Sequence, residues 1–138
     1  MKRTIATAFF LASLFAAGHA SAQDHVIKAN IPFDFTVGGK LLPSGTYLVT
    51  SSTDMSHVIQ IRDPQGSVAV FSSAYDSGNE SKTNKLIFNR YGDQYFLSEV
   101  LCSSAHMNVQ IPRSKLEKRV RSQEAQLQSD NQTFVALK

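Results

Sequence analysis

The densest cluster of charged side chains lies toward the C-terminal end of the sequence. Five basic residues fall within nine positions, and Glu117 is the acidic residue among them. The five are Arg113, Lys115, Lys118, Arg119 and Arg121. Clustered cations steer anionic partners toward a surface, although the charged face of an amphipathic helix often contacts nothing but water. We therefore treat these residues as the candidate contact for an acidic partner: an anionic envelope component, a polysaccharide or another protein.

The overall charge balance does not favour nucleic acid as that partner. The chain has 14 Lys and Arg against 11 Asp and Glu, a formal net charge of +3. Without residues 1–22, which contain Lys2 and Arg3, 12 basic and 11 acidic residues remain, a net charge of +1. A net charge this small, with no nucleic-acid-reading motif, predicts no nucleic-acid partner.

The histidines, serines and single cysteine show no spacing typical of a catalytic or metal site. His57 and His106 stand far apart in the sequence, and no H-x-H or H-E-x-x-H pair occurs. The nucleophile motif G-x-S-x-G is also absent. Cys102 ends an apolar run, which favours a buried thiol. The sequence thus predicts no catalytic residue, metal ligand or cofactor, and it favours a protein that is not an enzyme.

A small hydrolase is the alternative, because a sheet fold can bring distant residues together. Such an enzyme would need a concave site that joins His57 or His106 to a carboxylate and a serine. A purely structural protein of the envelope or matrix is the third hypothesis.

The first 22 residues have the three-part pattern of a cleavable signal peptide. Basic Lys2-Arg3 is followed by a mostly apolar segment, 5–17, and then by the small-residue pattern Ala20-Ser21-Ala22. The apolar segment is shorter than the roughly 20 residues of a transmembrane helix. We predict cleavage between Ala22 and Gln23 and export to the periplasm or the cell exterior. The mature chain, residues 23–138, is then one domain with no transmembrane segment.

Alternating apolar residues dominate the mature chain and predict strands. Ile27, Ala29, Ile31, Phe33, Phe35 and Val37 share one parity, which is the period of a half-buried strand. The turn sequence Asp63-Pro64-Gln65-Gly66 and the two-residue loop Gly92-Asp93 each join two further apolar runs. Residues 72–84, rich in Ser, Asn and Gly, are interpreted as a mobile surface loop.

A single helix is predicted after these strands, at about residues 114–127. Ser114 and Glu117 have the spacing of a capping box, and Leu116, Val120 and Leu127 would form the apolar face. Together these patterns predict an all-β fold: an antiparallel β-sandwich or open barrel of about seven or eight short strands with one C-terminal helix.

The segment Pro32 to Val49 contains Gly38-Gly39-Lys40 and Leu42-Pro43-Ser44-Gly45, which look like fragments of functional motifs. The first lacks the upstream glycine and the following Ser or Thr of a phosphate-binding loop. The second has its glycine and threonine in the reverse order of a sortase signal, and no apolar tail follows. We interpret Gly38, Gly39, Pro43 and Gly45 as turn residues, with Phe33, Phe35 and Tyr47 pointing into the core.

This segment resembles the opening of an uncharacterised family of small exported bacterial proteins. The shared pattern is "PFDF-V----LP-G-Y-V", carried here by residues 32–49. The resemblance implies export and a β-sandwich, and it brings no activity with it. The leading hypothesis is therefore an exported β-sandwich that acts by binding.

Overall fold

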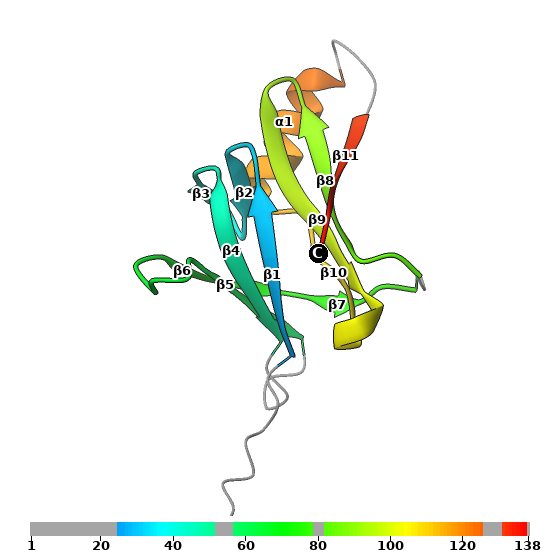
Figure 1. The fold of residues 1–138 in the computed structure, drawn as a ribbon. Coiled ribbons are helices and arrows are strands. Elements are labelled where there is room, and N and C mark those ends of the chain that lie inside the picture. The colour runs from blue at the N-terminus through cyan, green and yellow to red at the C-terminus, as the bar shows by residue number, and fades with distance from the viewer. Residues whose placement is uncertain (1–24, 52–56, 79–81, 126–130, 138) are drawn as a thin grey trace, which may run out of the picture.

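The computed structural model describes residues 25–51, 57–78, 82–125 and 131–137, shown in Figure 1. The predicted signal peptide, residues 1–22, and its cleavage site lie outside the described residues. Within the described ranges, no helix is both long and apolar enough to cross a membrane.

Strands dominate the described chain. They are β1 (His25–Ile31), β2 (Phe35–Val37), β3 (Lys40–Leu42), β4 (Gly45–Ser51), β5 (Val58–Arg62), β6 (Ala69–Ser73), β7 (Tyr75–Asp76), β8 (Lys85–Tyr91), β9 (Gln94–Cys102), β10 (Met107–Gln110) and β11 (Asn131–Ala136). A short 3-10 helix, η1 (Ser103–Ala105), joins β9 to β10, and the α-helix α1 (Lys115–Glu124) follows β10.

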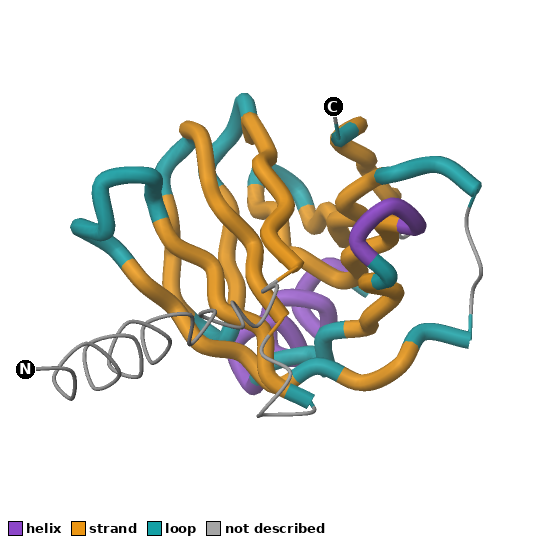
Figure 2. Tube along the Cα trace, turned by 60° about the horizontal axis from the view of Figure 1, so that its bottom comes forward, coloured by secondary structure: helices purple, strands orange, loops and turns teal. Residues whose placement is uncertain are grey.

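These strands form two sheets that face each other. Sheet A has the order β1-β4-β5-β6, and sheet B has the order β11-β8-β9-β10-β7. In sheet B, β2 also pairs with β9, and β3 pairs with β2. One of the sheets curls into a half-barrel, and Figure 2 shows the strands curving around a common interior. The predicted all-β sandwich or open barrel with one helix is confirmed. The structure has more strands than expected because β2, β3 and β7 are only two or three residues long.

The alternating segment 27–37 is divided between the two sheets at Pro32. β1 pairs with β4 in sheet A, whereas β2 pairs with β3 and β9 in sheet B. Proline has no backbone N–H to donate, so it suits a place where the chain leaves a sheet. The alternation is confirmed in β1, where Ile27, Ala29 and Ile31 are buried, and Phe33 after it is half-buried. It is wrong in β2, where Thr36 is buried together with Phe35 and Val37.

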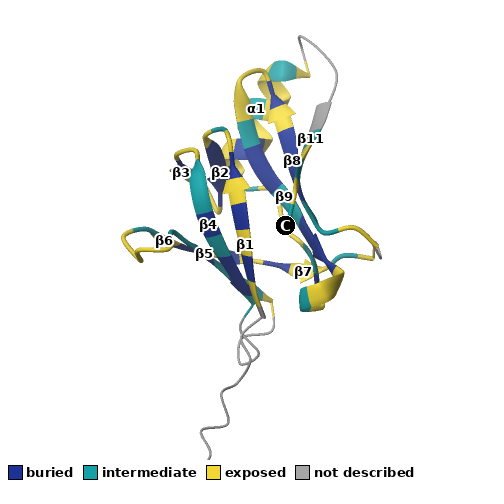
Figure 3. Cartoon of the chain, viewed as in Figure 1, coloured by how far each residue is buried: buried dark blue, intermediate teal, exposed yellow. Residues whose placement is uncertain are grey.

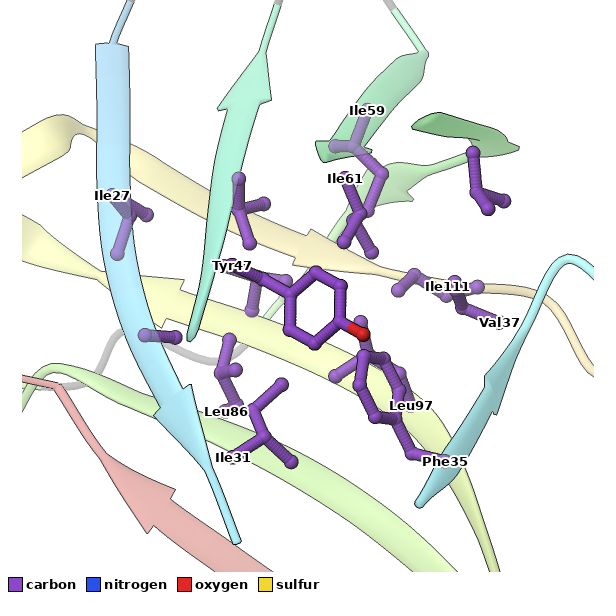
Figure 4. Packing of buried hydrophobic residues seen from close by; sticks show 14 of the residues in the cluster. Ile27, Ile31, Phe35, Val37, Tyr47, Ile59, Ile61, Leu86, Leu97 and Ile111 are labelled. Carbon is purple, nitrogen blue, oxygen red and sulfur yellow. The ribbon is translucent and has the colours of Figure 1, made fainter. Parts of the chain in front are cut away.

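The hydrophobic core fills the space between the sheets, where their buried faces meet (Figure 3). Phe35, Leu86, Phe88 and Val100 are completely buried there. Figure 4 shows side chains from both sheets pointing toward one another, with the ring of Tyr47 among them. Full burial of an aliphatic or aromatic side chain stabilises a fold by about 1.5–3 kcal/mol, so this core provides the framework for the surface sites.

The Pro32–Val49 segment is explained by this packing. The hydroxyl of Tyr47 donates to the carbonyl of Pro43 at 2.7 Å, and its ring lies 5.3 Å from that of Phe35 between centroids. The backbone N–H of Ser44 donates to the Asp34 carboxylate at 2.7 Å. The four-residue spacing of Pro43 and Tyr47 thus allows the tyrosine hydroxyl to bond the proline carbonyl. The tyrosine corner of other β-sandwiches has a similar hydrogen bond.

The glycines of this segment have two different roles. Gly38 and Gly39, between β2 and β3, have φ angles of +58° and +83°, which glycine adopts without strain. Gly38 also lies against β6, since a Cβ there would come within 3.4 Å of the carbonyl oxygen of Phe71. Gly45 is the first residue of β4 and does not have a positive φ. A glycine is therefore not required there to allow a left-handed backbone conformation.

Candidate anion-binding site

Helix α1 lies on the face of sheet B that points away from sheet A (Figure 1). It begins as the sequence predicts, because the Ser114 hydroxyl accepts a hydrogen bond from the backbone N–H of Glu117 at 3.1 Å. The other interaction of the predicted capping box, in which the Glu117 carboxylate accepts from a backbone N–H, is replaced by contacts with the sheet. The Glu117 carboxylate turns toward the sheet, where Asn89 Nδ2 donates to it at 2.8 Å and the Tyr91 hydroxyl at 3.3 Å.

The predicted apolar face of this helix is wrong. Leu116 is 39% exposed and Val120 is half-buried, while Glu117 is 4% exposed. Leu127 and the predicted end of the helix lie outside the described residues. The physical reason is that the sheet presents polar Asn89 and Tyr91 beneath the helix, and these side chains select a carboxylate as their partner.

The orientation of Glu117 determines where the basic residues lie. An α-helix turns by about 100° per residue, so Lys115, Lys118 and Arg119 point to the side of the helix or away from the sheet. All three are exposed, as is Arg121. Arg113 precedes the helix, and its Nε lies 3.7 Å from the Glu117 carboxylate.

Two of the five predicted contact residues meet in one hollow. Its volume is about 340 Å³, and we call it the cationic hollow. Its described lining residues are Tyr75, Ser98, Gln110, Ile111, Pro112, Arg113 and Lys118. Lys115, Arg119 and Arg121 are not among these residues.

Backbone pairing fixes the walls of the cationic hollow. Tyr75 on β7 is the register partner of Gln110 on β10. The backbone N–H of Ile111 donates to the carbonyl of Ser98 at 2.7 Å, which holds the segment leading to Arg113 against β9. The hollow therefore combines two cations with hydroxyl and amide groups on a rigid frame.

The ion pair with Glu117 orients Arg113. The Arg113 side chain is 42% exposed, whereas that of Glu117 is 5% exposed. Because a guanidinium has five N–H donors in a planar fork, the contact through Nε leaves the terminal nitrogens for a ligand. An exposed arginine of this kind can bind a carboxylate or phosphate oxygen.

A second hollow, of about 230 Å³, shares Tyr75 with the first. We call it the histidine hollow. Its described lining residues are Ser51, His57, Val58, Ile59, Ala74, Tyr75, Asp76 and Val109. The rings of His57 and Tyr75 lie 6.0 Å apart between centroids at an interplanar angle of 31°.

The histidine hollow has the residue types that the hydrolase alternative requires, since Ser51, His57 and Asp76 all line it. In this structure those three side chains make no hydrogen bond to one another; the His57 ring contacts Tyr75. The arrangement lacks the paired nucleophile and base of a preformed catalytic site. His106, the second histidine considered for a hydrolase site, ends η1 in a left-handed conformation and is not in the described lining of either hollow.

The Ser, Asn and Gly content of residues 72–84 leads to their interpretation as a mobile loop, and this gives Tyr75 no role in a site. That interpretation is wrong at this point: the segment contains the end of β6 and all of β7. A strand of two residues is too short for a visible alternation pattern. The available signal was an aromatic residue within a stretch of small polar residues.

Among the described residues, no group of three or more His, Cys, Asp or Glu side chains is arranged to hold a metal ion. No protein-family model matches the chain, and neither a curated protein nor a solved structure matches it.

Proposed function

We propose that the protein is an exported, non-catalytic binding module that holds an anionic group of an envelope component in the cationic hollow. The observation that carries this proposal is the convergence of Arg113 and Lys118 on one cavity with Tyr75, Ser98 and Gln110. The cationic hollow has a volume of about 340 Å³. This lies at the lower end of the range for ligand pockets, roughly 300–1,000 Å³. A carboxylate or phosphate group would find both charge and hydrogen-bond donors there.

A polymeric ligand suits this surface better than a small free anion. An exposed ion pair contributes about 0.2–1 kcal/mol, so two partly exposed cations bind a single anion weakly. Exposed Lys115 and Arg119 lie on the same helix and can contact further charges of a long ligand. Linked weak contacts gain affinity through effective concentration.

Export is the part of the proposal that rests on residues 1–22. Their basic, apolar and small-residue segments support signal-peptidase cleavage. Intact-mass measurement of secreted protein should give the mass of a chain that begins at Gln23. A secreted chain that retains Met1 to Ala22 would contradict this part.

The binding proposal is tested with the mature protein and a sulfated polysaccharide as the anionic probe. Lys118→Gln should weaken binding severalfold at low ionic strength, and binding should fade toward about 0.15 M salt, where the screening length is about 8 Å. Lys40→Gln is the matched control, because Lys40 is an exposed lysine on β3 outside the hollow. Equal losses in the two variants would show that net charge, and not the hollow, binds the polymer.

A small hydrolase is a second candidate, favoured by one observation: Ser51, His57 and Asp76 line the histidine hollow. Turnover of an ester or glycoside that disappears in His57→Asn and persists in Lys118→Gln would establish it. Equal turnover by the parent and by His57→Asn would exclude this site as its source.

A further inference from the structure

We propose that the cationic hollow and the histidine hollow are neighbouring subsites for one polysaccharide in which acidic and neutral sugars alternate. This inference rests on the proposed function, and it names the ligand class. Tyr75 is a lining residue of both hollows and would lie between the two sugars.

The two hollows differ in charge in a way that suits different sugars. Arg113 and Lys118 line the cationic hollow, which favours the carboxylate of a uronic acid. The described lining of the histidine hollow has no lysine or arginine, and it includes the acidic residue Asp76. A carboxylate accepts hydrogen bonds from sugar hydroxyls and repels a second anion.

This difference argues against uniformly charged ligands. A polymer with a negative charge on every unit, including a nucleic acid, would place one charge beside Asp76. A neutral sugar next to an acidic one avoids that repulsion. Ser51 and His57 then offer further polar groups to the neutral unit.

Tyr75 provides the surface between the two units. It is 56% exposed, and the His57 ring beside it extends the aromatic area. The flat faces of sugar rings carry C–H groups that pack on aromatic rings, while their hydroxyls stay available for hydrogen bonds. Aromatic side chains give such contact area with few rotatable bonds.

The segment around Tyr75 is held by backbone hydrogen bonds on both sides of it. The N–H of Ala74 donates to the carbonyl of His57 at 2.8 Å, and the N–H of Ser77 donates to the carbonyl of Asn108 at 2.9 Å. β7 itself pairs with β10 between these two bonds. A rigid wall reduces the ordering cost of binding.

The experiment measures binding of the mature protein to five probes by calorimetry. Three are tetrasaccharides: one of alternating glucuronic acid and N-acetylglucosamine, one of galacturonic acid, and a neutral one of N-acetylglucosamine. The other two are free glucuronic acid and a single-stranded oligonucleotide. The alternating tetrasaccharide should bind most tightly. Tyr75→Ala should weaken it by about tenfold or more, as truncation of a contact aromatic does. It should weaken free glucuronic acid by a smaller factor, because that ligand fills only one of the two hollows that Tyr75 lines.

Two further variants sharpen the result. Asp76→Asn should raise the affinity for the galacturonic acid tetrasaccharide, because it removes the repulsive charge. Phe134→Ala is the control for loss of an exposed aromatic, since Phe134 lies on β11 and is not in the described lining of either hollow. Circular dichroism checks that each variant is folded.

The outcomes separate the inference from the proposed function. Equal binding of the alternating tetrasaccharide and free glucuronic acid, unaffected by Tyr75→Ala but lost in Lys118→Gln, would overturn the two-subsite inference and leave the proposed function intact. Lys118-dependent binding of a single-stranded oligonucleotide in preference to the alternating tetrasaccharide would also overturn it. If no anionic probe binds in a Lys118-dependent way, both fail.

Discussion

Tyr47 connects the core to the turn that precedes its own strand. Its hydroxyl bonds the carbonyl of Pro43, and its ring packs against Phe35. Burial raises the pKa of this hydroxyl above its ordinary value of 10, and the nearby Asp63 and Asp34 carboxylates raise it further. The folded protein therefore holds Tyr47 in its neutral form, as the hydrogen bond to Pro43 requires.

Tyr47→Phe should lower the free energy of unfolding by about 0.5–1.5 kcal/mol near neutral pH, the usual net contribution of one hydrogen bond. In alkaline solution the unfolded chain ionises Tyr47 first, because its pKa is lower there. The stabilisation is thus complete below about pH 10 and is lost as the pH rises toward the folded pKa. Urea titrations of both proteins across this range should show their difference shrinking.

Tyr95→Phe is the matched control for this pH dependence. The Tyr95 ring stacks on Phe33 with centroids 4.0 Å apart, and it is half-buried. The difference in unfolding free energy between parent and variant should shrink with rising pH for Tyr47→Phe. If it shrinks equally for Tyr95→Phe, the pH dependence does not come from Tyr47.

Helix α1 is attached to sheet B through a buried carboxylate. Glu117→Ala would leave the Asn89 amide and the Tyr91 hydroxyl without this acceptor. A buried polar group that loses its partner costs about 1–3 kcal/mol, so we expect a loss of that size in the free energy of unfolding. Glu117→Gln keeps an acceptor oxygen and should cost less.

Gln123→Ala is the control on the same helix, because Gln123 is exposed. It should change stability by no more than about 0.5 kcal/mol in chemical denaturation. Equal effects of Glu117→Ala and Gln123→Ala would show that the buried cluster does not hold the helix.

The helix also shows how far local sequence patterns reach. Its start was predictable because Ser114 acts on a backbone group three residues away. Its buried face was not, because that face depends on Asn89 and Tyr91 from a distant strand. The same limit applies to β7, which exists through its pairing with β10. The basic cluster was visible in the sequence, but the hollow that joins Arg113 and Lys118 to Tyr75 required the fold.

The thiol of Cys102 reports on the integrity of the entire core. It is 3% exposed, and its Sγ lies 3.2 Å from the Ser104 hydroxyl. The predicted burial is confirmed. A thiol reagent should label it slowly in the native protein and rapidly in denaturant, because labelling requires an opening of the fold.

Ser67→Cys in a Cys102→Ser background is the control, since Ser67 is exposed between β5 and β6. That thiol should react rapidly under native conditions. Equally fast native labelling of Cys102, or a covalent dimer on a non-reducing gel, would contradict its burial.

Folding must bring Thr36 beside Phe96 before the parallel pair of β2 and β9 can form. Closing a loop of about 60 residues costs on the order of 4 kcal/mol in chain entropy, whereas the hairpins β4–β5 and β8–β9 close over a few residues. The last strand, β11, pairs with β8, although β9, β10 and α1 lie between them in the sequence. Such distant pairings are typical of domains that fold in milliseconds to seconds. A chain with this topology stays unfolded for longer than a helical bundle of its size. If the protein is exported, as we propose, this delay would leave time for transport before the sheets assemble.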